Sequence, residues 1–189
     1  MTFSDKKSAR AYLREKRNKM SDEYLRQASD ILTKKIIALE EFKDADTVLL
    51  FYPLGSEPDL LGVMNKALEL GKKVAFPISI PDTYALEFHE VTSTDEMKLG
   101  TYRIAEPPTD APMPLFTPQT LCVVPALALD RQGYRIGYGK GYYDRFLSEF
   151  SGISVSAVFE ELLCDSLPTE ATDIQLDILI TQTGVIRIR

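Results

Sequence analysis

Residues 120–130 read TLCVVPALALD, a nearly continuous apolar run that ends at an aspartate. The run is too short to cross a membrane as a helix, which takes about 20 apolar residues. Continuous apolar runs of this kind are typical of strands that are covered on both faces in a parallel sheet. The run therefore predicts a central strand with helices packed on either side of it.

Other segments continue this pattern. The β-rich run at 47–53 and the strand pattern at 72–77 flank an amphipathic helical pattern at 58–71, an order that implies two parallel strands. Residues 83–91 alternate as expected for a further strand, in antiparallel orientation, and ISVSAVF and DILIT supply two more. We predict an α/β fold for residues 1–189, a single-domain layered sandwich with a mostly parallel central sheet flanked by helices. The proline-rich residues 106–118 are predicted to form a surface loop of that domain.

The amino-terminal region is strongly basic in an acidic chain. Ser4 and Ser21 are predicted N-caps for helices reaching about Met20 and Glu40. The formal net charge is -6, yet residues 5–19 hold seven basic and two acidic residues, a local balance of +5. Four of the basic residues share one helix face, namely Lys7, Arg10, Arg14 and Arg17. This face is either a solvated surface or a cationic surface for an anionic ligand.

The overall composition excludes several classes of function. The acidic balance argues against broad nucleic-acid binding, and neither a membrane span nor a secretory signal is visible, so we expect a cytoplasmic protein. Cys122 and Cys164 lie in apolar surroundings and are predicted to be reduced core residues. His89 is the single histidine and has no nearby cysteine, so a zinc site built on it would lack ligands.

Residues 133–146, GYRIGYGKGYYDRF, place three alternating glycines after a buried strand and before a helix. Ligands of open α/β sheets bind at the carboxyl ends of strands. Glycines let successive backbone N–H groups converge on an anion, assisted by the positive end of the next helix. Arg135 and Lys140 would add positive charge, and Asp144 lies where it could hold a magnesium ion that bridges phosphate oxygens.

The glycine spacing matches neither familiar nucleotide motif. A P-loop requires Lys followed by Ser or Thr after its last glycine, and a dinucleotide-binding turn requires GxGxxG, whereas this chain has GxGxG. A tight loop with Tyr138, Tyr142 and Tyr143 as packing residues is the structural alternative. With the charged residues included, we favour a phosphate-binding site.

The segment DRQGYRIGYGKGYYDRFL closely resembles the signature of the 5-formyltetrahydrofolate cyclo-ligase family, also called methenyltetrahydrofolate synthetases. Further segments resemble the family in the same order along the chain: KKSARAYLREKRNKMS, FYPLGSEPDL, LGTYRIAEPP, VVPALALD and LPTEATDIQLDILIT. The resemblance implies an enzyme that uses ATP and Mg²⁺ to convert 5-formyltetrahydrofolate to 5,10-methenyltetrahydrofolate. It implies phosphoryl transfer to the formyl oxygen, attack by the neighbouring folate nitrogen, and release of phosphate.

The resemblance also implies roles for individual residues. The expected catalytic residues are Arg135, Lys140 and Tyr143. The expected ATP-binding residues are Lys6, Lys7, Arg10, Arg135, Ile136, Gly137, Tyr138, Gly139, Lys140, Gly141, Tyr142 and Tyr143. Tyr52 and Glu57 correspond to folate-side positions, and Asp144 and Asp173 to metal-binding positions. Thr172 stands where the family often has a histidine, so no imidazole role is expected there.

Two alternatives stay open at this level. A sugar-phosphate isomerase or acyl-CoA transferase would share the broad fold without using ATP, although it would leave the basic helix unexplained. A binding module for nucleotide and folate would hold both small molecules without turnover. In each case we expect a monomer without nucleic-acid or membrane partners.

Overall fold

Residues 3–188 are described by a computed structural model, and a seven-stranded sheet organises them, in the order β12-β11-β9-β6-β1-β2-β3. Its strands are β1 (Thr47–Leu49), β2 (Lys73–Ile80), β3 (Ala85–Glu90), β6 (Thr120–Val123), β9 (Ile153–Ala157), β11 (Ile178–Ile180) and β12 (Val185–Arg187). The five inner strands are parallel, and the edge strands β3 and β12 pair antiparallel with their neighbours. The predicted mostly parallel sheet is confirmed, as is the antiparallel third strand.

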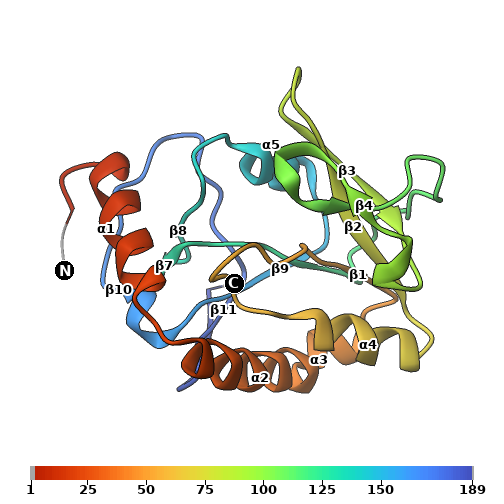
Figure 1. The fold of residues 1–189 in the computed structure, drawn as a ribbon, viewed down its shortest axis with the longest axis horizontal. Coiled ribbons are helices and arrows are strands. Elements are labelled where there is room, and N and C mark those ends of the chain that lie inside the picture. The colour runs from red at the N-terminus through yellow and green to blue at the C-terminus, as the bar shows by residue number, and fades with distance from the viewer. Residues whose placement is uncertain (1–2, 189) are drawn as a thin grey trace.

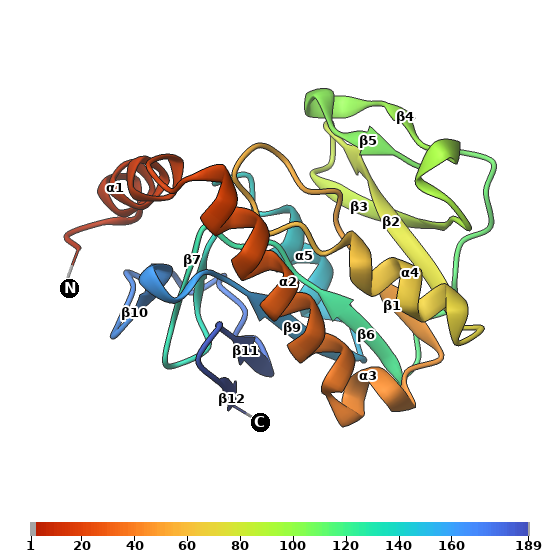
Figure 2. The same ribbon diagram turned by 60° about the horizontal axis from the view of Figure 1, so that its bottom comes forward.

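Five α-helices accompany the sheet in the described part of the chain. They are α1 (Lys6–Asn18), α2 (Asp22–Ala38), α3 (Glu40–Asp44), α4 (Leu61–Glu69) and α5 (Tyr142–Glu149). Helices α2, α3 and α4 cover one face of the sheet and α5 lies on the other, whereas α1 stands apart from this layering, beside the ends of β7, β8 and β10 (Figures 1 and 2). None of these helices is long and apolar enough to cross a bilayer.

The helix starts follow local capping chemistry. Ser21 caps α2 as predicted, since its side chain accepts a hydrogen bond from the Tyr24 amide. The cap of α1 is Asp5 rather than Ser4, because the Asp5 carboxylate accepts the bond from the Ser8 amide. Both helices end two residues before the predicted positions, at Asn18 and Ala38.

The apolar run at 120–130 forms two strands rather than the single strand we predicted. Strand β6 ends at Val123, and Pro125, which has no N–H to donate to a sheet, follows it. The chain then enters β7 (Ala128–Asp130), which belongs to a separate three-stranded sheet with β8 (Arg135–Ile136) and β10 (Leu163–Cys164). The glycine-rich turn therefore follows β8 of the small sheet and not a strand of the central one.

A small hairpin, short 3₁₀ turns and a long loop complete the fold. A small hairpin of β4 (Lys98–Leu99) and β5 (Ala105–Glu106) lies beyond the β2–β3 pair (Figure 2). Three 3₁₀ turns occur at Thr94–Glu96, Thr101–Arg103 and Glu160–Leu162. The residues after Glu106 up to 119 contain no helix or strand, so the predicted surface loop is confirmed. Cys122 and Cys164 are buried free thiols, also as predicted.

Candidate functional site

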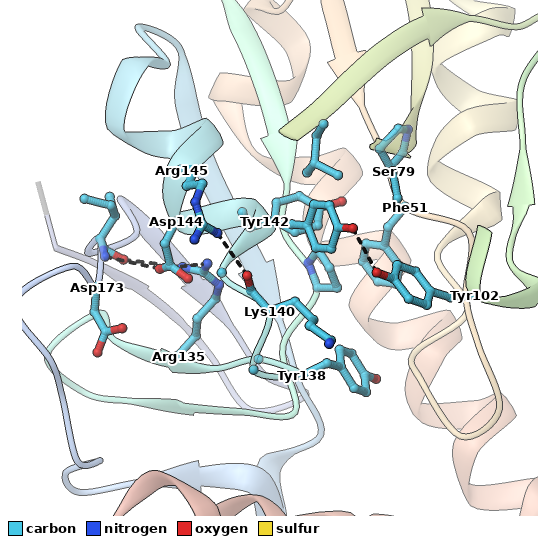
Figure 3. Close-up of a pocket in the computed structure, with 18 of the residues that line it drawn as sticks. Phe51, Ser79, Tyr102, Arg135, Tyr138, Lys140, Tyr142, Asp144, Arg145 and Asp173 are labelled. Carbon is cyan, nitrogen blue, oxygen red and sulfur yellow. Dashed lines mark hydrogen bonds and ion pairs between the residues drawn. The ribbon is translucent and has the colours of Figure 1, made fainter. Parts of the chain in front are cut away.

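A cavity of about 810 Å³ lies between the glycine-rich turn, α1 and the ends of the central strands. Its lining differs from one end to the other. Arg135, Asp144 and Asp173 lie at one end, and Phe51, Ser79 and Tyr102 at the opposite end, with Lys140 and Tyr142 between them (Figure 3). One end is therefore charged, and the other is aromatic and apolar.

The cavity lies where the strand order of the central sheet reverses. From β1 the chain continues to β2 on one side, whereas β6, β9 and β11 extend the sheet on the other. Phe51 and Tyr52 follow the carboxyl end of β1, Pro125 follows that of β6, and all three line the cavity. Open α/β sheets bind their ligands at such a switch point.

The glycine-rich turn gives the charged end its shape. Gly139 and Gly141 have φ values of +95° and +72°, in the region that favours glycine. A Cβ at Gly139 would lie 3.2 Å from the guanidinium carbon of Arg10, so glycine also permits close approach of α1. Gly141 is the N-cap of α5 and provides no side-chain cap. The first amides of α5 thus keep the capacity to bind an anion.

Two carboxylates at the charged end are each held by a basic side chain. Arg135 is buried and its guanidinium lies 2.9 Å from an Asp144 oxygen, which also accepts a bond from the Ile174 amide. The Lys6 Nζ lies 2.5 Å from an Asp173 oxygen and 3.2 Å from Glu170. Residues from both ends of the chain therefore meet in one site.

Helix α1 also reaches the glycine turn directly. The Arg10 Nε donates a hydrogen bond of 3.0 Å to the Gly137 carbonyl. Arg14 and Arg17 each place a guanidinium carbon 6.0 Å from the centre of the Tyr138 ring. At Arg10 and Arg17 the basic face thus packs on the turn and is not a solvated surface, whereas Arg14 stays exposed beside the Tyr138 ring.

Glu57 links this turn to the apolar end of the cavity. Its carboxylate accepts hydrogen bonds from the Tyr138 hydroxyl and from the Leu54 amide. Burial raises the pKa of Glu57, and the two hydrogen bonds and the charge of Arg17 act in the opposite direction. Burial and the nearby Glu57 charge raise the pKa of Tyr138 to about 12, so this phenol stays a hydrogen-bond donor at neutral pH.

Three tyrosines from separate segments meet at the cavity mouth. The hydroxyls of Tyr102 and Tyr142 lie 2.9 Å apart, and Tyr84 packs edge-on against the Tyr142 ring (Figure 3 shows the first pair). The ammonium of Lys140 lies 5.9 Å from the centre of the Tyr84 ring. The exposed Lys140 side chain is therefore located over the mouth rather than deep in the site.

Most of the residues predicted for the site line this one cavity. They are Lys6, Arg10, Tyr52, Glu57, Arg135, Gly137, Tyr138, Gly139, Lys140, Gly141, Tyr142, Tyr143, Asp144 and Asp173. Lys7 and Ile136 do not line it: Lys7 is exposed, and Ile136 is buried in the core. Thr172 lines the cavity as well, at the position where the family often has histidine.

Sequence reasoning missed several lining residues, of which six are polar or charged: Ser79, Tyr102, Glu106, Arg145, Ser148 and Glu170. Glu106 accepts hydrogen bonds from the amides of Ser79 and Thr101, and it packs against Gly100, where any side chain would collide with its carboxylate. These contacts hold the turn that carries Tyr102, whose φ is +56°. The segment LGTYRIAEPP contains Tyr102 and Glu106, but nothing local in it reveals that Glu106 contacts β2.

A metal ion would have few protein ligands here. Within residues 3–188, no group of three or more His, Cys, Asp or Glu side chains is arranged to hold a metal. Asp144 and Asp173 nevertheless suit Mg²⁺ bound together with phosphates, since Mg²⁺ commonly takes one or two carboxylates and completes its shell with phosphate oxygens and water. The ion pairs of both carboxylates would have to loosen for that purpose.

Comparisons with known proteins agree with this geometry. A sequence profile described as the 5-formyltetrahydrofolate cyclo-ligase family matches residues 2–182. A 5-formyltetrahydrofolate cyclo-ligase of Mycolicibacterium smegmatis is 30% identical over 76% of this chain and 77% of its own. The Escherichia coli enzyme of the same name is 26% identical over 92% of this chain and 98% of its own.

A solved structure gives the same result. The NMR structure of Aquifex aeolicus 5,10-methenyltetrahydrofolate synthetase superposes with a TM-score of 0.84 at 30% identity, covering 97% of this chain and 93% of that one. The relatives named 5-formyltetrahydrofolate cyclo-ligase or 5,10-methenyltetrahydrofolate synthetase are ligases, so the comparisons identify this chain as an enzyme of that class. The chain described here therefore belongs to the 5-formyltetrahydrofolate cyclo-ligase family.

Proposed function

We propose that this protein converts 5-formyltetrahydrofolate to 5,10-methenyltetrahydrofolate with ATP and Mg²⁺, releasing ADP and phosphate. The proposal rests on one observation. The same cavity joins a glycine-rich turn suited to phosphate binding to an apolar end, where the carboxylate of Glu57 is buried. A cavity of about 810 Å³ falls in the size range of small-molecule sites.

In the proposed reaction the formyl oxygen attacks the γ-phosphorus of ATP, and ADP leaves. The adjacent anilino nitrogen of the folate then attacks the activated carbon and loses its proton. Phosphate departs with the former formyl oxygen. Phosphoryl transfer depends chiefly on positioning and on neutralisation of negative charge.

The charged end of the cavity supplies both the positioning and the positive charge that phosphoryl transfer requires. The amides at the start of α5 and in the glycine turn can cradle phosphate oxygens, and Lys6, Arg10 and Lys140 bring positive charge from two sides. Arg135 forms an ion pair with Asp144 and points its guanidinium into the same end. The Tyr143 hydroxyl is buried without a partner among the described residues, so a ligand atom would satisfy it.

When bound, Mg²⁺ would neutralise negative charge on the phosphates. Asp144 and Asp173 are the residues that would hold it. Their present partners, Arg135 and Lys6, would then be free to turn toward the phosphates.

The other end suits the folate. Phe51, Tyr52 and Tyr102 offer ring surfaces for a flat heterocycle, and the Glu57 carboxylate can accept hydrogen bonds from its N–H groups. The formyl group would then lie between this end and the phosphates.

Absorbance of the methenyl product tests the proposal directly. Purified protein with 5-formyltetrahydrofolate, ATP and Mg²⁺ should form methenyl product and ADP in equal amounts. Folded protein that yields neither contradicts the proposal. Binding of both small molecules without turnover would instead identify a binding module.

Lys140→Ala tests the role of the glycine turn. Removing one flexible cation from the phosphates should lower kcat/KM by about 10- to 100-fold, with the protein still folded, because charge-assisted hydrogen bonds contribute about 1.5–3 kcal/mol. Lys98→Ala is a suitable control, because Lys98 is exposed and does not line the cavity. Unchanged kinetics in Lys140→Ala would remove Lys140 from the proposed mechanism.

A further inference from the structure

The contacts around Glu57 form a chain that starts on α1 and ends at the apolar side of the cavity. Arg17 donates through Nη2 to the Tyr138 hydroxyl at 3.0 Å and through Nε to Ser56 at 3.1 Å. The Tyr138 hydroxyl donates in turn to Glu57 Oε1, and the Leu54 amide donates to Oε2 at 2.8 Å. Each Glu57 oxygen is therefore engaged, one by backbone and one by the phenol.

The two ends of this chain of contacts are buried, whereas Tyr138 between them is 43% exposed. Arg17 and Glu57 are 4% and 8% exposed, and the Ser56 hydroxyl passes the chain on to Asn18 at 2.9 Å. The Tyr138 phenol is the only group among the described residues that contacts both the arginine and the glutamate by a hydrogen bond. The phenol stands between a buried cation and a buried carboxylate. The positive charge of Arg17 can therefore stabilise the ionised form of Glu57 through the Tyr138 hydroxyl.

We propose that Tyr138 is a positioning residue that, with Arg17 behind it, orients the Glu57 carboxylate toward the folate end and favours its ionised form. The expected change in KM rests on the proposed function, whereas the expected change in the Glu57 pKa does not. Burial alone favours the protonated acid, so the hydrogen bonds oppose that tendency. Tyr138 was predicted as an ATP-binding residue of the glycine turn, and this second role concerns the folate instead.

Other charged and titratable groups face Glu57 from the elements around it. Burial raises the pKa of Tyr143 of α5, and the nearby Cys122 and Glu57 raise it further, so Tyr143 lies close to Glu57. On the far side Glu57 also lines a groove between α2 and α4, together with Asp22, Arg26, Asp30 and Asp59. These groups stay unchanged when Tyr138 is altered, so a Tyr138 variant isolates the relay.

Tyr138→Phe tests the inference, because it removes the hydroxyl and leaves the ring against Arg14 and Arg17. We expect the Glu57 pKa to rise further, since one charge-assisted hydrogen bond to the ionised form is lost. The direct measurement is a ¹³C NMR titration of glutamate carboxyl carbons in substrate-free protein, with the Glu57 signal assigned from Glu57→Gln. Tyr12→Phe is the matched control, as Tyr12 is an exposed tyrosine on α1.

The direction of the expected change in the Glu57 pKa sets the direction of the expected change in KM. A higher pKa means that less Glu57 is ionised at a given pH on the acid side, so the rise in KM for 5-formyltetrahydrofolate should begin at higher pH. The KM for ATP should keep its wild-type pH profile. A general structural role would instead shift both profiles or neither.

A Glu57 signal that titrates at the wild-type pH in folded Tyr138→Phe protein overturns the proposal. If Tyr138→Phe does not fold, Arg17→Met removes the cation behind the phenol and should raise the Glu57 pKa in the same direction; no change there overturns the proposal equally. The titration requires no substrate. If the wild-type protein is inactive but the Glu57 pKa is higher in the variant, the proposed function is contradicted and the inference about Tyr138 stands.

Discussion

Asp130 shows how one buried residue builds the site without touching a ligand. It is 1% exposed, and its carboxylate accepts hydrogen bonds from the amides of Gln132, Tyr134 and Leu167. The first two bonds close the turn between β7 and β8, and the third fixes the segment after β10. The sequence places Asp130 at a strand end before a glycine, which is typical of a turn, but the contact with Leu167 has no local signal.

Asp130→Ala should lower the free energy of unfolding by about 2–4 kcal/mol, because it leaves three backbone donors without their acceptor. Urea denaturation measures this change. Asp110→Ala, on the exposed loop, serves as the control and should stay within about 0.5 kcal/mol of wild type. Equal stability of the two variants would show that water replaces the carboxylate at no cost.

At the scale of elements, α1 shows what a charge pattern can and cannot predict. The spacing of Lys7, Arg10, Arg14 and Arg17 predicted a common face, and the three arginines do approach the glycine turn. The buried residues of the helix, however, are Ala9, Leu13 and only one of these arginines, Arg17. Because apolar burial fixes the rotation of the helix, Lys6 turns into the cavity and Lys7 faces away.

The pair Lys6 and Lys7 therefore provides a matched test of the helix orientation. Lys6→Ala removes a cation from the charged end and breaks the ion pair between Lys6 and Asp173. The KM for ATP should therefore rise by about 10-fold or more. Lys7→Ala removes the same charge from the exposed side, and its KM should change by less than about 2-fold. Steady-state kinetics at fixed ionic strength separates the two; similar effects would mean that α1 binds ATP by net charge alone.

The small elements were beyond sequence prediction for a physical reason. Strands β7, β8 and β10 have two or three residues each, too few for a period to appear. Their existence depends on long-range pairing, which follows from Pro125 ending β6 and from the Asp130 turn. The strand–helix–strand order at 47–77, in contrast, has enough length for both periods and was predicted correctly.

At the scale of the whole molecule, the site unites distant parts of the chain. Lys6 and Asp173 lie 167 positions apart, and Glu57 and Tyr138 lie 81 apart. The motifs indicated which residues belong to the site, while the distances that join them come from the fold. The ion pairs that occupy Asp144 and Asp173 could not be foreseen from the sequence, since they require α1, β8 and the 170–174 segment to converge.

This convergence predicts how ligands should affect stability. ATP with Mg²⁺ would contact α1, the glycine turn and the 170–174 segment at once, so unfolding any one of them would release it. At 100 times its Kd, a ligand that binds only the folded state adds about 2.7 kcal/mol. For a chain of this size that corresponds to a rise in Tm of about 5–11 °C, which differential scanning calorimetry can measure. The same addition should give a clearly smaller rise in Lys6→Ala, whose contact between the chain ends is lost, and the full rise in Lys7→Ala. An equal rise in all three proteins would place the nucleotide away from α1, and the charged end would then need another ligand.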